Sequence, residues 1–262
     1  MRGLLFRRSI TAVRGVINTM LDSVLPPCCV LCGQAQQTPG FCQLCRFALL
    51  HSWPPQAVSC QRCGLPRPQQ PVVPVGTPCG QCQRNPLQFD RVIALAIYQD
   101  AVREAVIAAK LPRYLPLARR LGEQLSELVE QQLRQQHPDL ITYVPTHFMR
   151  RLKRQGMGGV PTMAMAIGER LGCPVNGMLR VTRQVSKQSM LADSDRPDNV
   201  RGAFAIKKSY ALRASPVLRD QHILLVDDVL TTGSTASEIA SVLKAAGAAK
   251  VTLAVVARAV RR

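Results

Sequence analysis

An acidic pair and a run of hydroxyl residues stand next to one another late in the sequence. Asp227 and Asp228 follow an apolar run at residues 223–226, and a helical pattern begins at residue 234. The run of small polar residues, called the hydroxyl loop below, consists of Thr231, Thr232, Gly233, Ser234 and Thr235. Carboxylates can accept hydrogen bonds from vicinal sugar hydroxyls, and a Thr/Gly/Ser turn at a helix N-terminus offers N–H groups to a phosphate. The spacing therefore predicts a site for a sugar phosphate such as ribose 5-phosphate.

An ordinary capped helix is the alternative interpretation of this segment, with Thr232 or Ser234 as the N-cap. That alternative explains one hydroxyl and leaves the rest of the string without a role. A nucleoside triphosphatase is disfavoured, because the sequence contains no G-x-x-x-x-G-K-[ST] motif.

Nine of the ten cysteines lie between Cys28 and Cys82. They include four Cys-x-x-Cys pairs, which are Cys29/Cys32, Cys42/Cys45, Cys60/Cys63 and Cys79/Cys82. Two thiolates at this spacing can hold one metal ion, and two such pairs complete a tetrahedron. Glycine follows two of the pairs, at Gly33 and Gly64, where it permits a left-handed backbone. The pattern predicts two structural zinc ions in a double zinc ribbon.

Other interpretations of the cysteines fit less well. A disulfide framework is typical of small secreted proteins, and the N-terminus lacks the pattern of a signal peptide. A redox pair would explain one Cys-x-x-Cys but not four. Sequential pairing, with the first four paired cysteines on one ion and the last four on the other, is the simpler arrangement. A cross-braced arrangement stays open, as does Cys28 in place of Cys29.

The sequence from residue 89 onward alternates apolar strand patterns with helical periodicity. Strands are expected at residues 91–98, 139–144, 203–206, 222–226 and 250–257, and helices at residues 101–110, 115–136, 157–171 and 234–246. Continuous apolar strands between helices predict an α/β fold with a mostly parallel sheet covered on both faces. Ligands of such sheets bind beyond the carboxyl ends of the strands. We expect three parts: a helix at 1–25, the double zinc ribbon at 26–88 and the α/β domain at 89–262.

The net charge of +18 favours polyanionic partners. Residues 1–25 show a basic amphipathic helix, which could lie on an anionic membrane surface or, as we favour, pack on its own domain. The longest apolar runs, at 92–98 and 251–257, are far shorter than the ~20 residues that span a bilayer. A cytoplasmic protein is therefore expected, with peripheral contact to the inner membrane as the open alternative.

Residues 223–235 closely resemble the signature for phosphoribosyl pyrophosphate (PRPP) of type I phosphoribosyltransferases. With the four cysteine pairs, the chain is identified as a member of the ComF family. Three further segments resemble that family. They are Ala109-Lys110-Leu111, Val144-Pro145-Thr146-His147 with the basic residues after it, and Gln188-Ser189-Met190-Leu191. The chain departs from the family at Arg154-Gln155-Gly156-Met157-Gly158, where an asparagine is missing, and in the acidic residues Asp193 and Asp195.

The resemblance implies a role for each part of the site. Asp227 and Asp228 would bind the ribose hydroxyls, and the hydroxyl loop would bind the 5-phosphate. The pyrophosphate would lie near Pro145, Thr146, Arg150 and Arg151, and Lys187 and Arg196, in the loop at 183–201, would close over it. Mg²⁺ would bridge oxygens of the ligand.

Two functions follow from the resemblance, and both concern DNA uptake in natural competence. One is a phosphoribosyltransferase-like enzyme with an unknown acceptor. The other is a non-enzymatic module that senses PRPP or handles single-stranded DNA, with the competence machinery as a further partner. Aromatic residues make up only 4% of the chain, so DNA contact would be mainly electrostatic.

Overall fold

A computed structural model describes residues 27–37, 40–50, 59–66, 79–145, 158–183, 200–210 and 218–260. The chain divides into two compact units, Met1–Arg46 and Phe47–Arg262. The expected N-terminal helix lies outside the described residues, as do the candidate site residues Thr146, Arg150, Arg151, Lys187 and Arg196.

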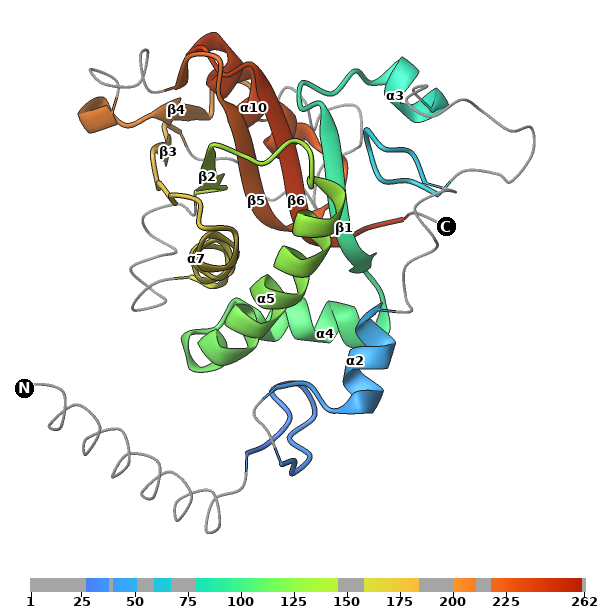
Figure 1. Ribbon diagram of the computed structural model, residues 1–262. Helices are drawn as coiled ribbons and strands as arrows, with labels where there is room; N and C mark the ends of the chain where they lie inside the picture. Colours follow the sequence, from blue (N-terminus) through green and yellow to red (C-terminus); the bar gives the residue numbers. More distant parts are fainter. Residues whose placement is uncertain are drawn as a thin grey trace, which may run out of the picture. The chain divides into compact units, whose positions relative to one another are not determined.

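The larger unit is built on a four-stranded parallel sheet with the order β1-β6-β5-β2 (Figure 1). The strands are β1 (Arg91–Ile97), β2 (Leu140–Tyr143), β5 (His222–Leu230) and β6 (Lys250–Arg258). Consecutive residues are buried along each strand, which explains why their sequences are continuously apolar. The expected α/β fold with a mostly parallel sheet is confirmed.

Helices connect the strands and cover the sheet. They are α4 (Asp100–Ala109), the short 3₁₀ helix η2 (Pro112–Tyr114), α5 (Leu115–Gln132), α7 (Gly159–Leu171) and α10 (Ser234–Ala245). The buried side chains of α5 recur at helical spacing, at Leu117, Leu121, Leu125 and Val129. Helix α5 packs closely on α7, where a Cβ at Gly122 would lie 2.7 Å from the Met163 carbonyl oxygen. The absence of a side chain at this glycine lets the two helices approach.

Helix α10 packs against β5 and β6 and covers a second part of the core. Its residues Ile239 and Leu243 belong to one buried cluster with Ile223 and Leu225 of β5 and Val251 of β6. Ile223 and Leu225 are two residues apart in β5, so their side chains point to one face of the sheet. The helix that follows the hydroxyl loop is thereby fixed to the strand that precedes it.

Strand β5 is longer than its apolar run predicts. Pairing with β6 continues to Leu230, which lies opposite Arg258, so both aspartates are part of the strand. The backbone ladder does not depend on side-chain polarity, and Val229 and Leu230 extend it past the acidic pair. The expectation that the strand ends at residue 226 is wrong by four residues.

A separate two-stranded antiparallel sheet consists of β3 (Leu179–Val181) and β4 (Phe204–Ile206). Strand β4 was expected from the sequence, but it does not join the parallel sheet. Strand β3 was not expected, because Arg180 interrupts its short apolar run.

Two short helices begin directly after cysteines of the Cys-x-x-Cys pairs. Helix α2 (Gln43–Leu50) starts after Cys42, and α3 (Gly80–Arg84) starts after Cys79. Neither was expected from the sequence. In the part of the chain that the structure describes, none of the helices combines the length and apolar character needed to cross a bilayer.

Candidate functional site

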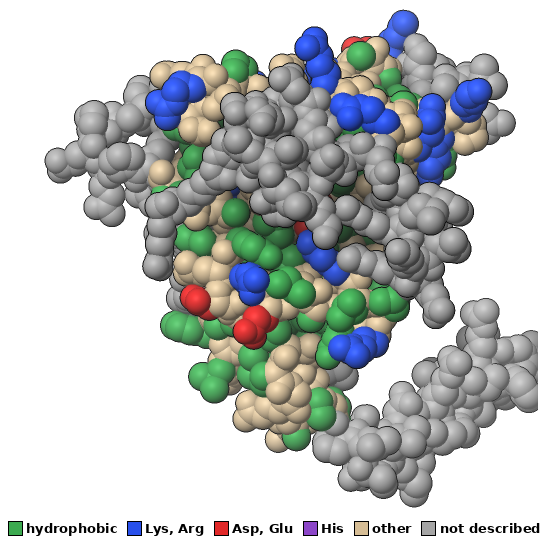
Figure 2. Space-filling view, turned by 180° about the vertical axis from the view of Figure 1, so that it is seen from behind, with side chains coloured by type: hydrophobic (Ala, Val, Ile, Leu, Met, Phe, Trp, Pro, Cys, Tyr) green, Lys and Arg blue, Asp and Glu red, His purple; other side chains and the backbone are tan. Residues whose placement is uncertain are grey.

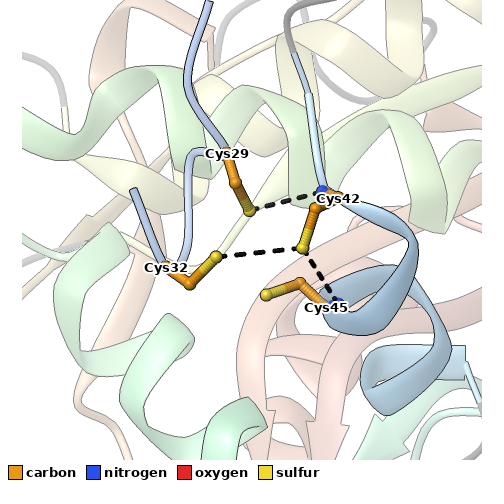
Figure 3. A group of neighbouring side chains, drawn as sticks. All are labelled: Cys29, Cys32, Cys42 and Cys45. Atoms are coloured by element: carbon orange, nitrogen blue, oxygen red, sulfur yellow. Dashed lines mark hydrogen bonds between the residues drawn. The ribbon is translucent and has the colours of Figure 1, made fainter. Parts of the chain in front are cut away.

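The first cysteine group consists of Cys29, Cys32, Cys42 and Cys45, whose sulfur atoms all lie within 4.8 Å of one another. Figure 3 shows the four side chains converging from a turn and from the start of α2. The sulfurs of Cys32 and Cys42 are 3.8 Å apart. The backbone N–H of Cys42 donates to the sulfur of Cys29 at 3.3 Å. The group contains Cys29 and not Cys28.

The second cysteine group consists of Cys60, Cys63, Cys79 and Cys82, also with all sulfurs within 4.8 Å of one another. Two sulfur pairs are 3.9 Å apart (Cys60 and Cys82) and 3.4 Å apart (Cys63 and Cys79). The structure thus groups the cysteines in sequence order rather than in a cross-braced arrangement.

The second cysteine group is built into the core of the larger unit. Cys60, Cys63 and Cys82 belong to the same buried cluster as Phe89 and Val92. The N–H of Val92 in β1 donates to the Gln61 carbonyl at 2.9 Å. The turn that carries the first Cys-x-x-Cys of this group is therefore held against an edge strand of the sheet.

Both groups fit a zinc ion by their donor chemistry and spacing. Four sulfurs about 2.3 Å from a central zinc lie roughly 3.8 Å apart, close to the observed separations. Burial alone would raise the pKa of Cys29, but hydrogen bonds from Cys32, Cys42 and Leu31 outweigh it and lower this pKa to about 6. The Cys60 thiol and burial raise the pKa of Cys63. A divalent cation would favour the thiolate form throughout either group.

The acidic pair lies at the carboxyl end of β5. Asp228 is only 15% exposed, and its carboxylate forms an ion pair with Lys110, with 2.9 Å between Oδ2 and Nζ. The Asp227 carboxylate accepts a hydrogen bond of 2.8 Å from the N–H of Asp228. Burial, and secondarily the charge of Asp228, raise the pKa of Asp227 to about 8. Asp227 therefore holds a proton at neutral pH, and Asp228 is the member of the pair that contacts Lys110.

Lys110 is a site residue for which the sequence analysis assigned no role. It follows the last residue of α4, and its side chain is 37% exposed beside Asp228. The signal that could have found it was the position of Ala109-Lys110-Leu111 after the first helix of the domain. A cation at this place neutralises the acidic pair and would face any anionic ligand bound there.

The hydroxyl loop connects β5 to α10. Gly233, with φ of 90°, is the N-cap residue and has no side chain to cap the helix, and the N–H of Ser234 donates to the Thr232 hydroxyl at 3.4 Å. Thr232 and Ser234 instead face each other, with their hydroxyl oxygens 3.0 Å apart. The alternative of Thr232 or Ser234 as N-cap is therefore wrong. The first turn of α10 keeps a partial positive charge, which suits a phosphate.

The segment after β2 reaches the same edge of the sheet. The N–H of Val144 donates to the carbonyl of Val226 at 3.0 Å, one residue before Asp227. This bond places Val144 and Pro145 beside the acidic pair. The structure therefore brings together Asp227, Asp228, Lys110, the hydroxyl loop and Pro145; the remaining predicted site residues lie outside the described part.

Comparison with known proteins agrees with this arrangement. Residues 117–262 match the family described as "Phosphoribosyl transferase domain". The DNA utilization protein YhgH of Salmonella typhimurium is 32% identical over 228 residues, which cover 81% of this chain and 94% of the relative. Competence protein F of Haemophilus influenzae is 26% identical over 185 residues, which cover 69% of this chain and 78% of the relative.

Among solved structures, a glutamine PRPP amidotransferase from B. subtilis aligns with 53% of this chain and 25% of its own, at 21% identity and a TM-score of 0.34. A score this low carries no functional argument. The domain match covers more than half of the chain, and the first relative spans most of both sequences. This chain therefore belongs to the phosphoribosyltransferase domain family and, within it, to the ComF family.

Proposed function

We propose that the chain binds PRPP at the carboxyl edge of its parallel sheet and serves the uptake or utilisation of DNA. The observation that carries the first part is the placement of the acidic pair and the hydroxyl loop at one end of β5. A carboxylate pair is suited to two sugar hydroxyls, and a helix N-terminus preceded by hydroxyl side chains is suited to a phosphate. Ribose 5-phosphate presents both groups.

The ligand would lie along this edge of the sheet. Its ribose hydroxyls face Asp227 and Asp228, its 5-phosphate lies in the hydroxyl loop, and its pyrophosphate points toward Pro145. Further contacts to the pyrophosphate are proposed for Thr146, Arg150, Arg151, Lys187 and Arg196. Mg²⁺ would neutralise the pyrophosphate and share oxygens with it, since Mg²⁺ in nucleotide and phosphate sites takes few protein ligands.

Lys110 gives this site an internal counter-ion. Its ammonium group neutralises Asp228 and lies within reach of a ligand placed on the acidic pair. A bound pyrophosphate would compete with Asp228 for the same ammonium group. Binding would therefore move the ammonium group of Lys110 from Asp228 to the pyrophosphate.

Calorimetry with PRPP and Mg²⁺ tests the proposed site directly. Asp228→Asn removes the charged acceptor of a ribose hydroxyl, and we expect a dissociation constant about 10- to 100-fold higher. Asp220→Asn is the matched control, because Asp220 is exposed, has a φ of 61° that asparagine tolerates, and lies outside the site. Equal binding by wild type and Asp228→Asn would remove the acidic pair from the site.

Pyrophosphate release separates the two modes of action. Transfer to an acceptor frees pyrophosphate, whereas a sensing module binds PRPP without releasing it. Bases, amines and DNA fragments are the acceptors to compare. Release that is lost in Asp228→Asn would identify an enzyme with this active site.

We also propose one structural zinc ion in each cysteine group. The sulfur separations and the four-thiol composition support it. Metal analysis of the folded protein should give two zinc ions per chain, and Cys42→Ser should reduce the content to one. A folded wild-type protein with a zinc content near zero would contradict the proposal.

The proposed DNA role rests on the names of the relatives and on charge. Both the DNA utilization protein YhgH and Competence protein F are named for DNA-related processes. The chain itself has a net charge of +18. On the face shown in Figure 2, basic side chains are prominent among the described residues and acidic ones are few. Such a surface favours the phosphates of nucleic acid.

A further inference from the structure

Arg258, the last residue of β6, is buried at the point where the sheet meets the second cysteine group. Only 4% of it is exposed. Its Nε donates to the carbonyl of Cys63 at 2.7 Å. Its Nη1 donates to the carbonyls of Leu230 at 2.9 Å and of Ala259 at 2.7 Å, and also to the carbonyl of Thr231. One guanidinium group therefore joins the turn of a cysteine pair to the first residue of the hydroxyl loop.

A second connection runs beside the first, through the residues that follow Cys82. The hydroxyl of Ser237 in α10 accepts a hydrogen bond of 3.0 Å from the N–H of Gln88. Gly233 lies so close to this segment that an added Cβ would be 3.0 Å from Cδ2 of Leu87. The hydroxyl loop thus rests on the chain that leaves the second cysteine group.

Charge adds to these contacts. A divalent zinc with four thiolates carries a net charge of −2, and a buried cation beside it compensates part of that charge. Burial lowers the pKa of Arg258, while the charges of Cys63, Cys82 and Cys79 act in the opposite direction. A guanidinium group presents several donors in a fixed plane, which an ammonium group cannot reproduce.

We propose that Arg258 is a positioning residue that couples the metal in the second cysteine group to ligand binding in the hydroxyl loop. The coupling rests on the proposed PRPP site. Because coupling between two binding sites is reciprocal, each ligand should raise the affinity of the other by the same factor. The first cysteine group belongs to the other compact unit, so it serves as an internal control.

Zinc release to a competing chelator tests the coupling in the wild-type protein. At equilibrium with the chelator, saturating PRPP with Mg²⁺ should raise the affinity of the protein for one zinc ion about 5-fold or more and leave its affinity for the other unchanged. Cys42→Ser lacks a ligand of the first group, and PRPP should have its full effect on the zinc ion that remains in the second group. Replacement of zinc by ¹¹³Cd gives a second readout, in which one of two resonances moves on addition of PRPP. If PRPP binds by calorimetry but neither ion responds, the coupling is overturned and the proposed function stands.

Substitution of Arg258 tests the same link without PRPP. In Arg258→Gln we expect faster zinc release from the second group and faster amide hydrogen exchange at residues 231–236, with the first group unchanged. Arg258→Lys should restore zinc release and amide hydrogen exchange only in part. Arg219→Gln, at an exposed position, should behave as wild type. If Arg258→Gln does not fold, Arg258→Lys carries the comparison.

If a folded Arg258 variant shows normal zinc release and normal amide hydrogen exchange, the proposal is overturned, whether or not PRPP binds. If PRPP does not bind the wild type but zinc release and hydrogen exchange are altered in the variant, the proposed function is refuted instead. In that case the structural link would stand.

Discussion

At the residue scale, Asp227 and Asp228 are adjacent but lie in different surroundings. Asp228 has a cation at 2.9 Å, whereas the carboxylate of Asp227 accepts a hydrogen bond from the backbone N–H of Asp228. Two neighbouring carboxylates in a confined place repel one another when both are charged, and burial adds to that cost. Such an unfavourable pair lowers stability, and groups with perturbed pKa values are common at functional sites.

The raised pKa of Asp227 has a predictable effect on stability. Since the folded state holds this proton up to about pH 8, its contribution is fully present below the ordinary carboxyl pKa and is lost as the pH rises through about 8. Asp227→Asn keeps the shape and removes the titration. We expect the variant to gain on the order of 1 kcal/mol or more of unfolding free energy over wild type at pH 8, and little at pH 4.

Denaturant unfolding at several pH values measures this difference. Asp220→Asn should show no such trend, because Asp220 is exposed. A constant difference between Asp227→Asn and wild type from pH 4 to pH 8 would show that folding does not raise the pKa of Asp227.

At the element scale, the two Cys-x-x-Cys turns that end in glycine have the same backbone conformation. Gly33 and Gly64 have φ values of 77° and 72°, and each donates its N–H to the carbonyl of the first cysteine of its pair, Cys29 or Cys60. The left-handed conformation was expected at both positions from their place after the second cysteine. The two turns differ in what surrounds them.

Paired substitutions separate the backbone effect from the packing effect. Gly33→Ala meets nothing within 4 Å, whereas a Cβ at Gly64 would lie 3.1 Å from Cγ1 of Val92. Both changes carry the strain of a left-handed residue, about 1–2 kcal/mol. We expect Gly64→Ala to cost more, because the turn must also shift away from β1. Denaturant unfolding and the zinc content of each variant give the measurement, and equal losses would show that the turn on β1 adapts freely.

The elements that carry the site were predictable because their patterns are long or chemically specific. The run at residues 223–235 shows a buried strand, an acidic pair and a helix start in order, and the structure keeps that order in β5 and α10. Helices α2 and α3 were missed because five to eight residues around cysteines show no clear hydrophobic period, and the three residues of β3 are equally uninformative. Arg258 was missed and Lys110, although it lies in a family-like segment, was given no role, since both roles depend on contacts with residues distant in the sequence.

At the scale of the whole molecule, several acidic residues lie in ion pairs on α5 and α7. Arg119 of α5 pairs with Glu123 of the same helix and with Glu169 of α7, and Glu130 of α5 pairs with Arg170 of α7. These ion pairs are exposed and contribute little to stability. Their effect is on charge distribution, because they leave the side formed by α5 and α7 nearly balanced. The surplus of basic residues lies elsewhere on the chain.

A net charge of +18 with few aromatic residues predicts how DNA affinity depends on salt. When contacts are mainly to phosphates, each neutralised phosphate of single-stranded DNA contributes about −0.7 to the slope of log affinity against log salt. We expect a steep linear decrease between low and physiological salt, little dependence on base sequence, and competition by heparin. Fluorescence anisotropy with labelled oligonucleotides of two unrelated sequences measures all three. Affinity that persists at high salt would require stacking or base contacts that this composition does not favour, and no binding at low salt would remove DNA from the list of ligands.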